Sequence, residues 1–222
     1  MINSLLSILA PHHCYGCQKI GIVLCDNCKF DITSEPFSQC IVCRVPTLTG
    51  VCAKHRSLYE KAWCIGERHD VLEALIDGYK FANLKDGPGV FAAVLASILP
   101  EIPSDTRLVP IPTTRRHIRQ RGYDHTLLMA RQIKKQRGGE LYPILRRQTN
   151  TIQRGANRKT RIAQSEKAFM LDPSLSIDPT KPHLIIDDVL TTGATIDAAA
   201  KLLRAAGAEM IWVAVATRQP LD

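Results

Sequence analysis

Residues 183–195 read His-Leu-Ile-Ile-Asp-Asp-Val-Leu-Thr-Thr-Gly-Ala-Thr. The unbroken apolar run over 184–186 is typical of a parallel strand that is buried on both faces. Two adjacent carboxylates and a hydroxyl-rich turn follow this run. The Ala- and Leu-rich segment 196–206 then predicts a helix that ends at Gly207. A strand that leads directly into a helix is the repeating unit of an α/β protein.

The turn between this strand and this helix is suited to an anion. Free N–H groups point outward at the amino end of a helix, and the helix dipole favours negative charge there. Gly193 lets the backbone approach a ligand closely or adopt a positive φ, and Thr191, Thr192 and Thr195 add hydroxyl donors. Because the preceding carboxylates suit a sugar diol or a metal-bound sugar, the stretch predicts a ribose 5-phosphate site.

Residues 185–195 resemble the phosphoribosyl pyrophosphate (PRPP) signature of type I phosphoribosyltransferases, which has apolar residues, two acids, a short spacer and Thr-Thr-Gly-X-Thr. In that family the acids hold the ribose hydroxyls and the following loop holds the 5′-phosphate. The resemblance implies the first role for Asp187 and Asp188. It implies the second role for Thr191, Thr192, Gly193, Ala194 and Thr195. An ordinary α/β turn with helix-capping threonines is the alternative.

The rest of the chain alternates between the two kinds of element. Strands are predicted over 62–67, 107–111, 142–145 and 211–216, and helices over 71–81, 91–99, 115–121 and 123–137. This alternation predicts a doubly wound, mainly parallel sheet. Ligands of such sheets bind beyond the carboxyl ends of the strands.

Charge is concentrated in one part of this 222-residue chain, whose formal net charge is +8. Residues 107–161 contain 15 Lys or Arg against two acidic residues. This density indicates a polyanionic partner, such as pyrophosphate, a nucleotide or a nucleic-acid backbone. A solvated helix face is the alternative.

Two polar segments inside this basic region match places where phosphoribosyltransferases bind their substrate. A pyrophosphate-binding loop belongs after the strand 107–111, and the resemblance places it at Thr113, Thr114, Arg115, Arg116, Arg119 and Arg121. Residues 147–169 form a long polar segment, and such irregular loops are usually functional. Its position matches the flexible loop that closes over PRPP, with candidate residues Gln153, Arg158 and Arg161.

All eight cysteines lie between residues 14 and 64, and seven of them follow metal-ligand spacing with one histidine. The eight candidate ligands are Cys14, Cys17, Cys25, Cys28, Cys40, Cys43, Cys52 and His55. They suffice for two tetrahedral Zn²⁺ ions. The four ligand pairs could combine in consecutive order or in a cross-braced arrangement. Metal would supply folding energy to a segment with few large apolar residues. Redox-active pairs and an iron–sulfur cluster are the alternatives, and Cys64 is predicted to be a buried small hydrophobe.

Over nearly its full length the chain resembles the ComF-type competence proteins, which join a cysteine-rich zinc module to a phosphoribosyltransferase domain. The shared features are the C-x-x-C pairs and the motifs within 75–81, 110–112, 119–125, 149–161 and 186–193. Residues 122–125 read Gly-Tyr-Asp-His where that family usually has Gly-Phe-Asn-Gln. The resemblance divides the chain into a zinc-binding module over 1–60 and a phosphoribosyltransferase-like domain over 61–222. It implies structural zinc, and Mg²⁺ together with PRPP. It also implies a role in natural transformation, with single-stranded DNA and DNA-uptake proteins as partners.

No apolar run approaches the roughly 20 residues of a membrane span. Residues 1–10 lack the basic start and the cleavage site of a signal peptide. Leu5, Leu6 and Leu9 can line one side of a helix, so we expect a short amphipathic helix here. We therefore expect a cytoplasmic protein. Three functions fit: a Mg²⁺-dependent phosphoribosyltransferase, including one of nucleotide salvage; a PRPP or nucleotide sensor that binds nucleic acid; and a zinc module that docks onto other uptake proteins.

Overall fold

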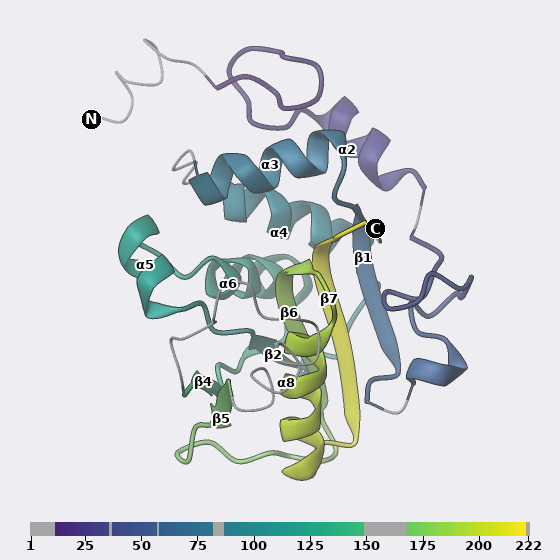
Figure 1. Cartoon of the computed structure of the whole chain (residues 1–222), viewed down its shortest axis with the longest axis vertical. Coiled ribbons are helices and arrows are strands. Elements are labelled where there is room, and N and C mark those ends of the chain that lie inside the picture. Colours follow the sequence, from purple (N-terminus) through teal and green to yellow (C-terminus); the bar gives the residue numbers. More distant parts are fainter. Residues whose placement is uncertain (1–11, 36, 57, 82–86, 149–167, 221–222) are drawn as a thin grey trace.

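The computed structural model describes residues 12–35, 37–56, 58–81, 87–148 and 168–220 (Figure 1). Its centre is a five-stranded sheet with the order β1-β7-β6-β2-β3, in which every neighbouring pair is parallel. The strands are β1 (Lys61–Glu67), β2 (Arg107–Pro110), β3 (Glu140–Leu141), β6 (Pro182–Leu190) and β7 (Met210–Arg218). β4 (Leu145–Arg147) and β5 (Phe169–Leu171) form a separate antiparallel pair. The predicted mainly parallel α/β fold is confirmed.

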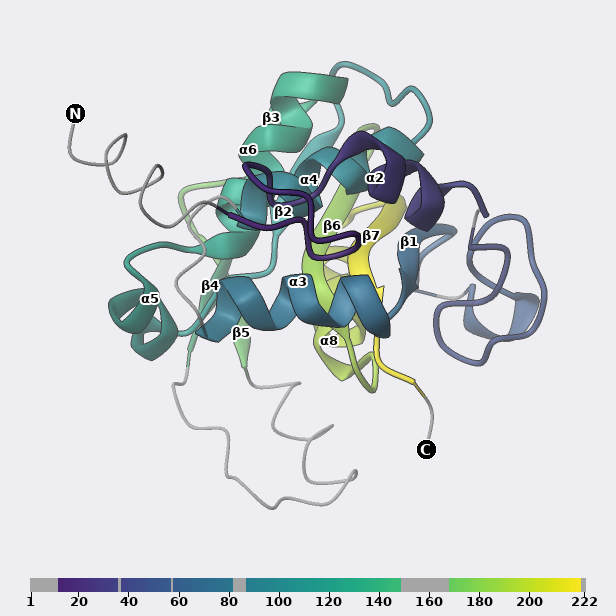
Figure 2. The same cartoon turned by 90° about the horizontal axis from the view of Figure 1, so that it is seen from above.

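Helices cover both faces of this sheet (Figure 2). Buried residues of α3 (Asp70–Phe81), α4 (Gly87–Ile98) and α6 (His125–Arg137) share one core with Leu184 and Ile186. Buried residues of α8 (Ala194–Ala205) share the opposite core with Ile185. Successive residues of a strand point to opposite faces. The apolar run in β6 is therefore unbroken because both of its faces are covered.

The sequence located most helices within a few residues. α5 (Arg115–Arg121) has the predicted bounds and ends at Gly122, whose φ is +82°. α6 begins at His125, two residues later than predicted, because the Asp124 carboxylate caps the helix by accepting the Leu127 N–H. Helices lie where the segments 71–81, 91–99 and 196–206 predicted them. The helix predicted over residues 1–10 lies outside the described residues.

Two strand predictions need correction. β6 continues to Leu190, so Asp187 and Asp188 lie within the strand and not after it, because pairing with β7 extends to the end of both strands. The strand predicted over 142–145 is wrong. Pro143 has no N–H for a ladder, so β3 ends before it, and the chain turns at Ile144 before β4 begins.

The cysteine-rich segment packs on the same two cores as the sheet. Cys14, Cys25 and Cys28 are buried with the residues of α3 and α4, next to the short helix α2 (Asp26–Thr33). Ile41 and Val51 are buried in the core that α8 covers, and a single 3₁₀ turn, Ala53–His55, follows them. Cys64 is buried in β1, as predicted. Within the described parts of the chain, no helix is long and apolar enough to cross a membrane.

Candidate functional site

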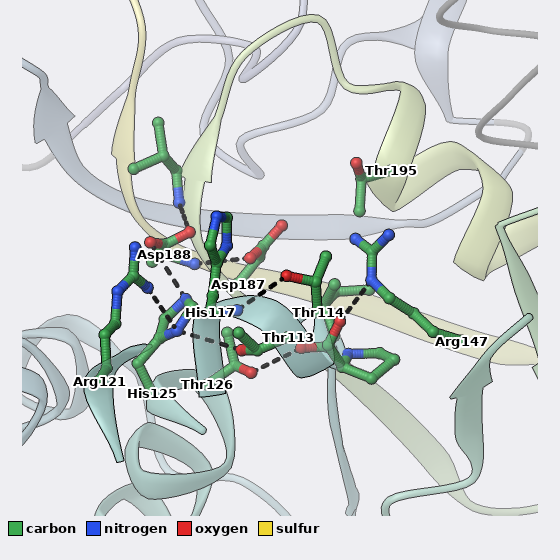
Figure 3. Close-up of a pocket in the computed structure, with 13 residues that line it drawn as sticks. Thr113, Thr114, His117, Arg121, His125, Thr126, Arg147, Asp187, Asp188 and Thr195 are labelled. Carbon is green, nitrogen blue, oxygen red and sulfur yellow. Dashed lines mark hydrogen bonds and ion pairs between the residues drawn. The ribbon is translucent and has the colours of Figure 1, made fainter. Parts of the chain in front are cut away.

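A cavity of about 360 Å³ lies beyond the carboxyl end of β2 and beside the last residues of β6 (Figure 3). The strand register pairs Pro110 with Ile186, so the loop that follows β2 comes beside Asp187 and Asp188 near the end of β6. This volume and this place in a parallel sheet are typical of a small-molecule site. The cavity is lined by Ile111, Pro112, Thr113, Thr114, His117, Arg121, His125, Thr126, Arg147, Asp187, Asp188, Val189 and Thr195.

The two adjacent aspartates face this cavity although only 8% of Asp187 and 7% of Asp188 is exposed. Each carboxylate accepts the N–H of the next residue. Asp187 Oδ1 lies 2.9 Å from the Asp188 nitrogen, and Asp188 Oδ1 lies 2.8 Å from the Val189 nitrogen. Asp188 Oδ2 lies 3.2 Å from His125 Nε2. Buried carboxylates need such partners, and these contacts hold both of them at the cavity.

The hydroxyl-rich turn lies between β6 and α8. Gly193 adopts a φ of +80°, the second of the two possibilities that the sequence left open for it. Thr192 Oγ1 accepts the Ala194 N–H at 3.4 Å. Thr195 lines the cavity, whereas Thr191, Thr192, Gly193 and Ala194 are not among the lining residues. Thr191 and Thr192 are exposed, so their donors face solvent at the edge of the site.

The predicted pyrophosphate loop contributes only part of its residues to the cavity. Thr113, Thr114 and Arg121 line it. Thr114 also begins α5, since its hydroxyl accepts the His117 N–H at 3.3 Å. The predicted residues Arg115, Arg116 and Arg119 are exposed on α5 and are not among the lining residues. The cationic cluster is therefore divided between the cavity and the neighbouring surface.

Asp124 fixes the position of this loop. Its Oδ1 accepts the hydroxyls of Thr113 at 2.9 Å and Thr126 at 2.8 Å. Its Oδ2 accepts the Thr113 N–H at 3.3 Å. The same carboxylate caps α6. One side chain therefore joins the loop after β2 to the start of a core helix.

Sequence reasoning missed Arg147 as a site residue, because it stands at the end of a strand that was not predicted there. Its Nε donates to the Pro112 carbonyl at 2.9 Å, and its guanidinium carbon lies 5.1 Å from the centre of the Phe169 ring. Burial lowers the pKa of Arg147, while the charges of Asp187 and Asp124 act to raise it. A partly buried cation thus faces the same cavity as the aspartates. The predicted loop residues Gln153, Arg158 and Arg161 lie outside the described residues.

His117, His125 and Thr126 are three further lining residues that sequence reasoning did not single out. His125 stood within a quoted motif, yet nothing in the sequence showed that its ring reaches β6. Only the register of β2 and β6 and the entry angle of α6 bring that ring to Asp188. Its position in the site is therefore a result of the fold.

The eight candidate metal ligands form two separate groups. The first cysteine cluster contains Cys14, Cys17, Cys25 and Cys28, and the second contains Cys40, Cys43, Cys52 and His55. Within each cluster the ligand atoms lie within 4.8 Å of one another. The geometry selects consecutive pairing from the two arrangements that spacing allowed.

Distances within both clusters fit tetrahedral zinc. Zn–S bonds of about 2.3 Å place two sulfurs about 3.8 Å apart. Cys17 and Cys25 have their sulfurs 3.6 Å apart, as do Cys43 and Cys52. His55 turns Nδ1 toward its cluster, 3.2 Å from the Cys52 sulfur and 3.6 Å from the Cys40 sulfur. Each cluster could hold one zinc ion.

Backbone N–H groups make one thiol in each cluster more acidic. Burial alone would raise the pKa of Cys14, but hydrogen bonds from the backbone of Cys25, Cys17 and Gly16 lower it to about 6. The same opposition lowers the pKa of Cys40 to about 6. Metal ligands must be thiolates, so the backbone favours the ligating form even before metal binds.

Comparisons with known proteins agree with this geometry. The phosphoribosyl transferase domain family matches residues 90–221. The chain is 30% identical over 215 residues to competence protein F of Haemophilus influenzae, covering 90% of this chain and 93% of that protein. It is 27% identical over 195 residues to competence protein ComFC of Streptococcus pneumoniae, covering 86% and 79% of the two chains.

Proposed function

Since the chain belongs to the phosphoribosyl transferase domain family, among the ComF-type competence proteins, we propose that it binds PRPP with Mg²⁺ in the cavity beyond β2 and β6. One observation carries the proposal. The two aspartates, Thr195 and the Thr113–Thr114 loop, which come from three separate segments, line one cavity. Together they offer hydrogen-bond acceptors for a diol, a hydrogen-bond donor for a phosphate and a second set of donors for pyrophosphate.

The proposed roles follow from charge and donor type. Asp187 and Asp188 accept hydrogen bonds from the ribose hydroxyls, and the turn Thr191–Thr195 donates to the 5-phosphate. Thr113, Thr114 and Arg121 hold the pyrophosphate, with Mg²⁺ neutralising part of its charge. Gln153, Arg158 and Arg161, which lie outside the described residues, are proposed to bind the ligand by the resemblance to the family's flexible loop.

Calorimetric titration of PRPP with Mg²⁺ tests this proposal. We expect the wild type to bind, and Asp187→Asn/Asp188→Asn to lose most of its affinity. Asp178→Asn is the control, because Asp178 is also a hydrogen-bonded aspartate but does not line the cavity. A folded, zinc-loaded wild type that fails to bind PRPP would contradict the proposal, as would equal loss of affinity in both variants.

Transfer of the phosphoribosyl group to an acceptor is the enzymatic form of this proposal. Cations on the pyrophosphate and anions near the sugar would stabilise positive charge developing at the anomeric carbon. Acceptor-dependent release of pyrophosphate measures this activity. Release that occurs equally in the double asparagine variant would exclude the cavity as its source.

A second candidate function is the binding of single-stranded DNA. Arg115, Arg116 and Arg119 are exposed on α5 beside the cavity, so they present positive charge that the PRPP site leaves unused. Aromatic residues make up 5% of the chain, which limits stacking with bases and makes phosphate contact the main source of affinity.

The salt dependence of oligonucleotide binding tests this second function. Each phosphate contact contributes about 0.7 to the slope of log affinity against log salt for single strands, so we expect Arg115, Arg116 and Arg119, all changed to Gln, to lower the slope by about 2. Changing Arg131, Lys134 and Lys135 to Gln removes the same charge from the exposed face of another helix, α6. Equal slopes in both triple variants would indicate binding to net charge and not to α5.

The relatives are named competence proteins, and we propose by that likeness that this chain acts in natural transformation with proteins of the DNA-uptake machinery. We also propose that both cysteine clusters hold structural zinc and that the protein works in the cytoplasm, since thiols at metal-ligand spacing suit a reducing compartment. The division into a zinc module over 1–60 and a phosphoribosyltransferase-like domain over 61–222 is part of the same proposal.

A further inference from the structure

We propose that His125 is a positioning residue that orients the Asp188 carboxylate for the ribose hydroxyls. This inference rests on the proposed PRPP site, and it assigns a role to a side chain that lies at the first position of α6. The side chain comes from a different element than the carboxylate, so it can set the orientation of that group independently of β6.

The imidazole lies between β6 and the loop after β2 (Figure 3). Nε2 is 3.2 Å from Asp188 Oδ2, and Nδ1 is 3.1 Å from Thr113 Oγ1. His125 is 7% exposed and lines the cavity. Both ring nitrogens are thus in hydrogen-bond range of groups that the proposed site uses.

A carboxylate accepts hydrogen bonds, so the hydrogen of the contact between Nε2 and Asp188 belongs to the ring. Thr113 Oγ1 lies 2.9 Å from Asp124 Oδ1 and donates its one hydrogen to it. A carboxylate is a stronger acceptor than an imidazole nitrogen. Thr113 Oγ1 can therefore accept a hydrogen bond from the ring at Nδ1.

A second arrangement leaves the contact with Asp188 unchanged. Arg121 Nη1 lies 3.4 Å from the same Nδ1, so a ring without the Nδ1 proton would accept from Arg121. In that state the proton of the neutral ring is on Nε2. The Nε2–H therefore points to Asp188 in either state.

The consequence for Asp188 is a carboxylate that is held at both oxygens. Oδ1 is fixed by the Val189 N–H at 2.8 Å, and Oδ2 is fixed by His125. A ribose diol then meets acceptor lone pairs of set direction, and none of the binding energy is used to orient the group. Removing the imidazole leaves Oδ2 without this donor, so the carboxylate can turn about its last bond.

Three variants test this role. His125→Ala removes the donor, and we expect PRPP affinity to fall about tenfold, the effect of losing one charge-assisted hydrogen bond. His125→Gln keeps an N–H at similar reach, and we expect it to restore affinity to within about threefold of the wild type. His69→Gln is the matched control, because His69 makes a comparable contact of 3.1 Å with Glu67 but does not line the cavity.

A ligand-free measurement separates this inference from the proposed function. In ¹⁵N-labelled protein we expect a solvent-protected imidazole Nε2–H signal, assigned to His125 by its absence in His125→Gln and its persistence in His69→Gln. Asp188→Asn should weaken the acceptor and expose this proton to exchange. Zinc content and thermal unfolding show whether each variant is folded.

The outcomes are distinct. A tenfold loss in the alanine variant that glutamine reverses supports the proposal, and equal affinity of the wild type and His125→Ala overturns it. A missing Nε2–H signal, or one unchanged in Asp188→Asn, also overturns it. A wild type that does not bind PRPP but loses the signal in Asp188→Asn refutes the proposed function and supports the orientation of Asp188 by His125.

Discussion

Arg218, the final residue of β7, donates from Nη1 to the carbonyl oxygen of Cys40 at 3.1 Å. Its Nη2 donates to the Val42 carbonyl at 3.2 Å. Only 1% of Arg218 is exposed, and burial lowers its pKa, as does the charge of Arg44. An arginine still keeps its charge in proteins, so a buried cation joins β7 directly to the second cysteine cluster.

We expect Arg218→Met to lower the free energy of unfolding by about 3 kcal/mol, because two buried carbonyl groups lose a charged donor. Arg146→Met is the control. The Arg146 side chain is 59% exposed and pairs with Asp172. Asp172 also accepts the N–H and the hydroxyl of Ser174, so it keeps partners when Arg146 is changed, and we expect a loss of about 1 kcal/mol. Urea denaturation compares the two. Equal effects would show that Arg218 contributes no more than a surface pair.

Gly50 permits a close approach of the second cluster to β1. Its φ is +72°, and a Cβ there would lie 1.9 Å from the Ala62 carbonyl oxygen. Gly122 has a φ of +82° but open space around it. We expect Gly122→Ala to destabilise by about 1 kcal/mol from backbone strain alone, and Gly50→Ala by more than twice as much. Similar melting temperatures for the two variants would contradict the contact.

Native mass spectrometry of serine variants tests both the zinc content and its pairing. We expect two zinc ions in the wild type. Cys17→Ser/Cys28→Ser changes two members of the first cluster, so it should lose one ion. Cys17→Ser/Cys43→Ser changes one member of each cluster and should lose both. A cross-braced arrangement predicts the reverse result for the two double variants.

Asp124→Ala should reduce both stability and PRPP affinity, because this carboxylate caps α6 and holds Thr113. Loss of a helix cap costs about 1 kcal/mol, and the released hydroxyls add to that. Asp178→Ala is the control, since the Asp178 carboxylate accepts from Thr180 in a surface turn. Thermal unfolding measures the first effect and calorimetry the second. An unchanged PRPP affinity would show that the loop keeps its position without Asp124.

The sequence predicted the features of the fold that neighbouring residues determine. The unit from β6 to α8 follows from the apolar run and the turn residues, because neighbouring residues alone decide a strand, a turn and a helix start. The eight candidate metal ligands were predicted from spacing, yet spacing could not decide how they pair, because the pairing depends on how the segment folds back on itself. Consecutive pairing became visible only when the ligand atoms were placed.

The parts of the site that the sequence did not reveal depend on distant elements. Arg147 reaches the cavity because β4 begins after Pro143 and pairs with β5. The two segments are distant in the sequence, so no local pattern predicts that they pair. His125 reaches Asp188 through the register of β2 and β6. The aspartates looked like the end of a strand because they are polar, but β7 keeps β6 extended beyond them.

The strand order also has a consequence for the nascent chain. Among the residues that the structure describes, β1 pairs within the sheet with β7 alone, and β7 is made long after β1. A ribosome adds about 5–20 residues per second, so β1 emerges on the order of ten seconds before its neighbour. During that interval its apolar side chains have no sheet to join, whereas the ligands of both cysteine clusters have already been made. The emergence of β7 is therefore the event that lets the sheet close.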